Sequence, residues 1–347
     1  MIPSFIKPSD TIAVTAPSHP IDRQDDRIRF MHGAELLKQR GYNVVFTANV
    51  FNDPDRYGRS SSPEEKAAEL NALIADDKIT AIFSASGGDF LAEMLPYVDI
   101  DNFKKHPKWI QGYSDNTSLL YYLSTKADIA TAYGANFGDF GMDPWQLSVS
   151  RGLSILEGSC SVQENFDSYQ NGFLSRQNPF DGYSADEKVQ WKCLRASEKD
   201  GSVKMTGRLL GGCMDVLLNI AGTPYDGTTE YIESYKEDGI IWYLESFDLH
   251  FEQMMEGLWK MKEMGWFKTA RGFIFGRPLF YPETAFDGSP LPSYEEVLLE
   301  RLAELDLPII TGADIGHKGP QFVMINTALA HVECSNGKAW AETLWNL

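Results

Sequence analysis

One serine stands where a short strand-like run meets a helix-like segment, a position that suits a nucleophile. The stretch WIQGYSDNTSLL places Ser114 two residues after the strand-like run 109–112 and before an apolar segment with helical spacing. A serine on such a turn is the arrangement of a nucleophile elbow, although the G-x-S-x-G pattern is matched only at Gly112, with Asn116 in place of the second glycine. The alternative is that Ser114 is only the N-cap of the helix, because Ser and Asp are favoured cap residues. Taken alone, the stretch favours the cap.

A glycine pair follows another strand-like run, ITAIFSAS. Gly87 and Gly88 lie where a parallel strand would end, and their backbone N–H groups could bind an oxyanion. A tight turn between strand and helix is the plainer interpretation. The sequence contains neither G-x-G-x-x-G nor a P-loop motif, so a nucleotide-dependent enzyme is the weaker alternative.

Two further side chains complete a possible catalytic set. Glu245 ends the apolar run IIWYLE, and a buried carboxylate needs a partner, which is either a Lys or Arg or an imidazole that the carboxylate orients. His317 lies in the glycine-containing loop GADIGHKGP, and its ordinary pKa of about 6.5 suits a general base, although most loop histidines have no chemical role. Ser114, Glu245 and His317 would together supply a nucleophile, a carboxylate and a base.

The elements that would position these residues alternate along the first 135 residues. Strand-like runs at 11–18, 42–50, 79–86, 109–112 and 129–136 are separated by helix-like segments. One helix has a clear start, with Ser62 as N-cap, Pro63 at the first helical position and Glu65 completing a capping box. This βαβ alternation predicts a mostly parallel sheet with helices on both faces.

The alternation breaks after about residue 150, which predicts a second domain. We assign residues 1–150 to an N-terminal domain carrying Ser114, 151–206 to a connector with an inserted loop, and 207–347 to a C-terminal domain carrying Glu245 and His317. In the last region, strands are expected at 240–246 and 272–276, and helices at 249–264 and 294–305. Two domains also suit the length of 347 residues.

Composition and charge exclude several classes of protein. The chain is 43% hydrophobic and 23% charged, without a run of about 18 apolar residues, which predicts a soluble globular protein and no membrane partner. The N-terminal stretch lacks the pattern of a signal peptide, so a cytoplasmic location is expected. The net charge of −18 repels phosphate backbones and argues against a nucleic-acid partner. The four cysteines lie far apart and read as reduced thiols, and no metal-binding spacing is present.

Several motifs in consistent order resemble one known family. IKPSDTIAVTAPSHP, SASGGDFLAEMLPYVD, WIQGYSDNTSLL, GRLLGGCMDVLLNIAGTPY, IIWYLES and ADIGHKGPQ are similar to successive motifs of the L,D-carboxypeptidases. These cytoplasmic serine peptidases include the microcin C self-immunity proteins, and the resemblance runs over nearly the whole chain. It implies an α/β fold with an N-terminal Rossmann-like parallel-sheet domain, a C-terminal β-rich α/β domain and an active site in the interdomain cleft.

The resemblance also implies roles for individual residues. Ser114 falls on the nucleophile, Glu245 and His317 on the other members of a Ser-His-Glu triad, and the backbone N–H groups of Asp115 and of Gly88 or Gly87 on the oxyanion hole. It implies no metal or organic cofactor. Family members are often dimers, so a homodimer is an expectation from the resemblance alone.

The substrate is predicted less directly. We predict removal of D-Ala from the murein tetrapeptide, with cleavage of an aminoacyl-nucleotide conjugate, as in the immunity proteins, as the alternative. A non-catalytic small-molecule binder with the same fold is a further alternative. Cys213 stands where the family has an asparagine expected to contact substrate. Trp191 lies in the inserted loop, where its ring could stack on a nucleobase or only pack the loop onto its domain.

Overall fold

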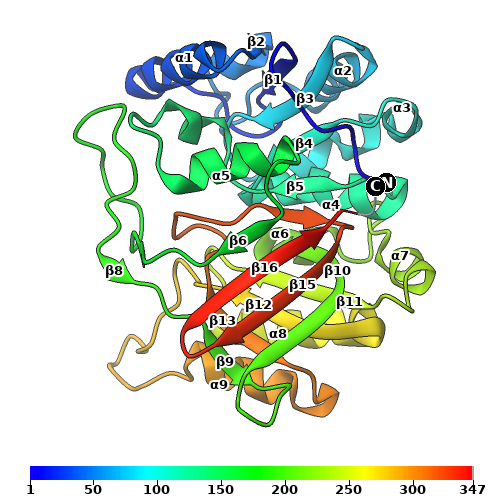
Figure 1. The fold of residues 1–347 in the computed structure, drawn as a ribbon, viewed down its shortest axis with the longest axis vertical. Coiled ribbons are helices and arrows are strands. Elements are labelled where there is room, and N and C mark those ends of the chain that lie inside the picture. The colour runs from blue at the N-terminus through cyan, green and yellow to red at the C-terminus, as the bar shows by residue number, and fades with distance from the viewer. Residues whose placement is uncertain (346–347) are drawn as a thin grey trace. The chain divides into compact units, whose positions relative to one another are not determined.

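The protein is represented by a computed structural model that describes residues 1–345, and the chain divides into two compact units. The first unit comprises Met1–Ser161, Leu174–Tyr183 and Phe322–Thr327. The second comprises Val162–Phe173, Ser184–Gln321 and the chain from Ala328 onward. Neither unit is therefore continuous in sequence. Figure 1 shows the elements of each in chain order.

The first unit is built on a six-stranded sheet with the order β14-β5-β4-β3-β1-β2. Its strands are β1 (Thr11–Thr15), β2 (Asn43–Phe46), β3 (Ile79–Ser84), β4 (Trp109–Gly112), β5 (Thr131–Tyr133) and β14 (Met324–Asn326). The first five strands run parallel, and only β14 pairs antiparallel, with β5. The prediction of a mostly parallel sheet is confirmed. The carboxyl ends of the neighbouring strands β3 and β4 consequently lie side by side.

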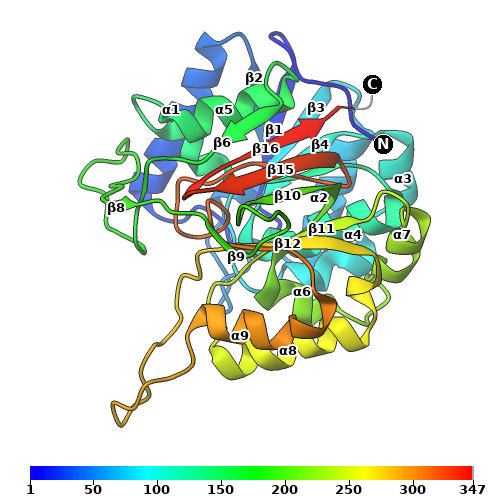
Figure 2. The same cartoon turned by 60° about the horizontal axis from the view of Figure 1, so that its bottom comes forward.

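Helices cover both faces of this sheet. They are α1 (Gln24–Gln39), α2 (Pro63–Ala75), α3 (Ile100–Lys105), α4 (Thr117–Ala127) and α5 (Leu147–Leu156), with short 3₁₀ turns η1 (Ala48–Phe51), η2 (Leu91–Tyr97), η3 (Ser114–Asn116) and η4 (Phe137–Gly141). Helix α1 packs against η4, whereas α2, α3 and α4 pack in succession (Figure 2). The predicted capping box at the start of α2 is confirmed, because Ser62 Oγ accepts from the Glu65 N–H and Glu65 accepts from the Ser62 N–H.

The second unit is built on an eight-stranded sheet with the order β6-β16-β15-β10-β11-β12-β13-β9. Its strands are β6 (Val162–Glu164), β9 (Lys192–Arg195), β10 (Val203–Cys213), β11 (Ile240–Glu245), β12 (Ala270–Gly276), β13 (Ile309–Ala313), β15 (Leu329–Ser335) and β16 (Lys338–Leu344). The four central strands β10 to β13 run parallel, and the pairings outside them are antiparallel. The predicted α/β class is thus confirmed for both units.

The helices of the second unit are short apart from one. They are α6 (Met214–Ile220), α7 (Thr228–Ser234), α8 (Phe251–Glu263) and α9 (Tyr294–Arg301), with 3₁₀ turns η5 (Trp266–Thr269) and η6 (Ala303–Leu305). Every residue of β11 is buried, and Trp242 stacks on Trp266 with ring centroids 5.5 Å apart. Within residues 1–345, no helix combines the length and the apolar character needed to cross a membrane.

Residues 160–205, which show no clear periodicity in sequence, contain more structure than expected. Strands β6 and β9 form the two edges of the eight-stranded sheet, and β7 (Ser168–Tyr169) pairs with β8 (Glu187–Lys188) in a small sheet of its own. Edge strands have one strand neighbour and one open side, so they need little apolar patterning. That is why the sequence pattern did not reveal them.

Candidate active site

Ser114 lies on a strained turn between β4 and α4. Its backbone φ is +64°, in the left-handed region that non-glycine residues rarely adopt. Such a conformation costs on the order of 1–2 kcal/mol for an L-residue, so the surrounding structure must impose it. This strained strand-to-helix turn is the backbone geometry of a nucleophile elbow.

The expectation that Ser114 caps the following helix is wrong. The N-cap of α4 is Asn116, and the N-cap of the 3₁₀ turn η3 is Tyr113. The buried Asn116 side chain ties the turn together by donating from Nδ2 to the carbonyl groups of Ser86 and Tyr113. Because Ser114 lies two residues before the N-cap Asn116, its conformation serves the turn and not the helix start.

Glycines around Ser114 allow the two strand ends to approach closely. A Cβ atom on Gly87 would lie 3.0 Å from both Cβ and Oγ of Ser114, so any larger residue would press on the serine. Gly88 has a φ of +152°, and a Cβ there would lie 2.3 Å from the Ser18 hydroxyl. The glycine pair after β3 therefore lies against the serine turn after β4, as the parallel pairing of these strands requires.

The Asp115 side chain holds the Ser114 turn by hydrogen bonds to residues outside the turn. It is buried and accepts hydrogen bonds from Ser18 Oγ at 2.5 Å and from the Leu91 N–H at 2.9 Å. Burial raises the pKa of this carboxyl above its ordinary value, although the two hydrogen bonds act in the opposite direction. Sequence reasoning considered only the Asp115 backbone and missed Ser18, which belongs to the motif TAPSHP.

In the second unit, Glu245 at the end of β11 contacts His317 in the loop after β13. Glu245 Oε2 lies 2.9 Å from His317 Nδ1, and both side chains are buried. An ionised Glu245 accepts a hydrogen bond from the protonated Nδ1, which leaves Nε2 as the basic nitrogen of the neutral ring. The imidazole is therefore a partner of the buried carboxylate.

Glycines and an aromatic ring shape the space around this pair. A Cβ on Gly316, whose φ is +96°, would lie 2.4 Å from Glu245 Oε2, and a Cβ on Gly276 would lie 2.9 Å from Glu245 Cβ. The Phe247 ring packs edge-on against the imidazole, with centroids 5.0 Å apart. Burial alone lowers the pKa of His317, but Glu245 raises it more, and the resulting pKa lies above the ordinary 6.5.

A second carboxylate near the pair escaped the sequence reasoning. Asp215, in the first turn of α6, accepts from the backbone N–H groups of Phe247 and Asp248, each at 2.9 Å. It thereby fixes the chain directly after Glu245, and its charge contributes to the raised pKa of His317. The only sequence feature that could have indicated Asp215 was the position of an acidic residue just after the glycine-rich end of β10.

Cys213 ends β10 directly opposite Glu245 in the parallel register. It is 1% exposed, and burial together with the Glu245 and Asp215 charges raises the pKa of its thiol well above the ordinary value. The residue therefore remains a neutral thiol beside the Glu245 carboxylate. Nowhere in the described part of the chain do three or more His, Cys, Asp or Glu side chains form a group that could hold a metal ion.

The loop carrying His317 is held by a buried ion pair. Arg277 Nη2 lies 2.7 Å from Asp314 Oδ1, and Arg277 also donates to the carbonyl groups of Gly312 and Lys318. These bonds hold the chain before His317, at Gly312 and Asp314, and directly after it, at Lys318. Asp314 Oδ2 in turn accepts from the Trp191 indole N–H at 3.0 Å. Trp191 is 1% exposed, so the structure favours packing of the inserted loop over stacking on a ligand.

We expect Trp191→Phe to lower the free energy of unfolding by about 1–3 kcal/mol, because it leaves one oxygen of the buried Asp314 without its indole donor. Thermal and urea unfolding of the purified protein would measure the change. Trp259→Phe is the matched control, since Trp259 is 53% exposed. Equal stability of wild type and Trp191→Phe would contradict a structural role for the indole.

Comparisons with known proteins identify the family of the chain. The family model described as the LD-carboxypeptidase N-terminal domain matches residues 12–134. The family model described as the LD-carboxypeptidase C-terminal domain matches residues 206–332. The microcin C7 self-immunity protein MccF of Escherichia coli is 28% identical, with 91% of this chain and 88% of that protein covered. A probable murein peptide carboxypeptidase of Bacillus subtilis is 23% identical, with 93% and 88% covered.

A solved structure shares the fold over the whole length. The crystal structure of an MccF-like protein from Bacillus anthracis superimposes with a TM-score of 0.81 at 22% identity, covering 99% of this chain and 100% of that one. The first unit has a strained serine turn, and the second unit has a buried Glu–His pair. The chain belongs to the LD-carboxypeptidase family. It is accordingly a serine-type carboxypeptidase.

Proposed function

We propose that this protein hydrolyses the terminal amide bond of the murein tetrapeptide, releasing D-Ala, through a triad of Ser114, His317 and Glu245. The observation that carries the proposal is the buried Glu245–His317 pair at 2.9 Å. A carboxylate that accepts from Nδ1 leaves Nε2 to act as the base, which is the role of a triad histidine. The strained turn at Ser114 and membership of the family support the same assignment.

The proposed mechanism uses only groups of the protein. His317 Nε2 takes the Ser114 hydroxyl proton as Oγ attacks the scissile carbonyl, and Glu245 stabilises the imidazolium that forms. The N–H groups of Asp115 and of Gly88 or Gly87 stabilise the oxyanion, an effect on the order of 3 kcal/mol for each donor. The imidazolium then protonates the leaving amine. Water, deprotonated by His317, releases the acyl group and restores Ser114.

Activity should fall at low pH because the general base must be neutral. The pKa of His317 lies above 6.5 in the folded protein, so we expect kcat/KM to rise with pH through a midpoint above 6.5. The stability of the fold should depend on pH in the opposite direction. Stabilisation of the His317 imidazolium by Glu245 is fully present below the pKa that His317 has in the unfolded chain, and it is lost as the pH rises through the pKa of His317 in the folded protein. A pH–rate profile, with unfolding measured at the same pH values, would check both. A midpoint below 6.5 would contradict the pairing.

A second substrate class has its own support. MccF, which is 28% identical to this chain, has been solved in complex with aspartyl sulfamoyl adenosine and, as a variant, with adenosine monophosphate. The same triad would hydrolyse the bond between an aminoacyl group and a nucleotide-like moiety. Stacking of the nucleobase on Trp191 is not part of this proposal, because the Trp191 ring is buried.

One pair of assays separates the two substrates. Wild-type protein is incubated with L-Ala-γ-D-Glu-meso-diaminopimelate-D-Ala or with aspartyl sulfamoyl adenosine, and products are identified by mass spectrometry. Release of D-Ala supports the murein assignment, and release of aspartate from the second compound alone transfers the proposal to the immunity-type substrate. Turnover of neither compound would contradict both.

A further inference from the structure

Asp215 holds the short segment that follows β11 and contacts His317. Its Oδ2 accepts a hydrogen bond from the Phe247 N–H at 2.9 Å, and its Oδ1 accepts from the Asp248 N–H at 2.9 Å. Both oxygens of one carboxylate are therefore bonded to two consecutive backbone N–H groups. Hydrogen bonds to an ionised acceptor are roughly twice as strong as neutral ones, so Asp215 holds this segment firmly.

Close packing of two neighbouring strands brings Asp215 to this place. Strands β10 and β11 run parallel, and Cys213 at the end of β10 lies opposite Glu245 at the end of β11. A Cβ atom on Gly211 would overlap the Tyr243 carbonyl, so this glycine lets the backbone of β10 approach β11. Helix α6 begins directly after Cys213, and Asp215 is its second residue. Asp215 and Glu245 therefore come from adjacent strand ends.

The segment after β11 contacts the histidine through one aromatic ring. The Phe247 ring packs edge-on against the His317 imidazole, with centroids 5.0 Å apart. The segment is also tied to the chain that follows β12. The Ser246 carbonyl accepts from the Leu279 N–H at 3.1 Å, and the Phe247 carbonyl accepts from the Phe280 N–H at 2.9 Å. Because its carbonyl groups and its N–H groups are both bonded, the segment keeps the ring in one place.

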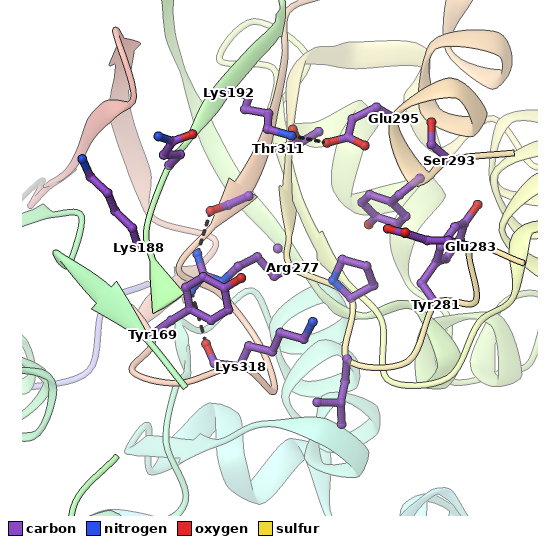
Figure 3. Close-up of a pocket in the computed structure, with 16 residues that line it drawn as sticks. Tyr169, Lys188, Lys192, Arg277, Tyr281, Glu283, Ser293, Glu295, Thr311 and Lys318 are labelled. Carbon is purple, nitrogen blue, oxygen red and sulfur yellow. Dashed lines mark hydrogen bonds and ion pairs between the residues drawn. The ribbon is translucent and has the colours of Figure 1, made fainter. Parts of the chain in front are cut away.

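The loop that carries His317 has a separate support. Arg277 donates to the Lys318 carbonyl at 3.2 Å, and Figure 3 shows this bond beside a pocket that both residues line. Arg277 thus fixes the backbone next to the histidine, whereas Glu245 and Phe247 contact the imidazole itself. The orientation of the imidazole therefore depends on Glu245 and on the segment that follows it.

The charges that act on the imidazole come from β11 and α6. Burial lowers the pKa of His317, but the Glu245 carboxylate and, to a smaller extent, the Asp215 carboxylate raise it above 6.5. Burial and the same two carboxylates raise the pKa of the Cys213 thiol and of the Tyr294 hydroxyl well above their ordinary values, so both groups are neutral. Glu245 bonds to the ring directly, whereas Asp215 acts on it through its charge and through the segment after β11.

Two further charged side chains lie next to this pair in sequence. Asp248 is exposed, so solvent screens its charge. Lys318 is half-buried, and burial together with the neighbouring Arg277 charge lowers the pKa of its ammonium group. Asp215 differs from both because its carboxylate bonds to the backbone that carries Phe247.

We propose that Asp215 is a positioning residue for the hydrolysis, which fixes Phe247 against the His317 ring and adds its negative charge to that of Glu245. The imidazole is thereby held with Nδ1 toward Glu245 and with Nε2 as the base. Asp215 itself does not touch the reacting atoms. The proposal rests on the proposed triad, in which a displacement of a catalytic group by about 1 Å costs about 100-fold in rate.

Asp215→Asn tests the proposal, because it keeps the size of the side chain, removes its charge and places an amide NH₂ against one of the two backbone N–H groups. We expect kcat/KM to fall about 10- to 100-fold, mainly through kcat. The midpoint of the pH–rate profile should also shift to lower pH, by less than in Glu245→Gln, since Asp215 contributes less to the raised pKa. NMR titration of the His317 imidazole would follow this pKa independently of catalysis.

Asp226→Asn is the matched control. Asp226, in the loop before α7, also accepts from two backbone N–H groups, those of Gly222 at 2.9 Å and Thr228 at 3.0 Å. Asp226→Asn should keep wild-type kcat and the wild-type His317 titration, so a loss of stability is separated from a loss of positioning. Phe247→Leu is a second variant, which keeps the backbone bonds to Asp215 and removes the ring. It should lower kcat and leave the His317 pKa closer to wild type than Asp215→Asn does.

Wild-type kcat in both Asp215→Asn and Phe247→Leu would overturn the proposal. Equal losses of kcat in Asp215→Asn and Asp226→Asn would also overturn it, because the effect would then be one of general stability. Failure of the proposed triad gives a different pattern, in which Ser114→Ala retains activity. If the triad is correct and the role of Asp215 is not, Ser114→Ala is inactive and Asp215→Asn is as active as wild type.

Discussion

Ser114→Ala is expected to lower kcat by roughly 10⁴-fold or more on whichever substrate the wild-type enzyme hydrolyses. The substitution removes the nucleophilic oxygen and leaves the +64° backbone turn to the same surrounding contacts. Alanine and serine have similar strain at this φ, so the fold should be retained. Residual activity would come only from binding and oxyanion stabilisation. Single-turnover assays with mass spectrometry would measure the loss.

The matched control for this prediction lies four residues further on. Ser118 is fully buried in α4, and its hydroxyl has no hydrogen-bond partner among the described residues. Ser118→Ala removes the same atom from the same segment, away from the turn, and should keep wild-type activity. If Ser114→Ala hydrolysed substrate as fast as Ser118→Ala, Ser114 would not be the nucleophile.

Glu245→Gln is expected to lower kcat by about 10⁴-fold, an effect as large as that of losing the orienting carboxylate in other triads. The amide can donate to Nδ1 and so stabilise the tautomer that carries its proton on Nε2, which is the wrong nitrogen for a base. The variant also loses the charge that raises the pKa of His317, so that pKa should fall. NMR titration of the imidazole would follow the second effect separately from catalysis.

A surface pair provides the comparison for Glu245→Gln. His331 Nε2 lies 3.1 Å from Glu333 Oε1 at partly exposed positions of β15. Glu333→Gln removes the carboxylate from this pair and should leave catalysis unaffected. Wild-type activity of Glu245→Gln would remove Glu245 from the mechanism, and an unchanged His317 titration would show that the charge does not act on the ring.

Much of the fold was predictable because its signals are local. The capping box from Ser62 to Glu65 needs only four residues of sequence to form, and the apolar run ending in Glu245 is buried along its whole length as β11. The alternation of strands and helices also predicted the parallel sheet of the first unit. Predictions failed where two local roles competed, as at Ser114, whose residue type fits a helix cap but whose neighbours impose a left-handed turn.

Outside residues 160–205, the sequence by itself indicated the main strands and helices and the chemical groups at their ends, because backbone propensity and apolar periodicity act over a few residues. Only the tertiary structure decided the partners of those groups. Glu245 meets His317 across 72 positions of the chain, and Arg277 meets Asp314 beside it. Strands β6 and β9 find their places only at the edges of a sheet formed by other segments. A buried charge must be paired, but which distant residue pairs with it depends on strand order, and strand order is a property of the packed sheet.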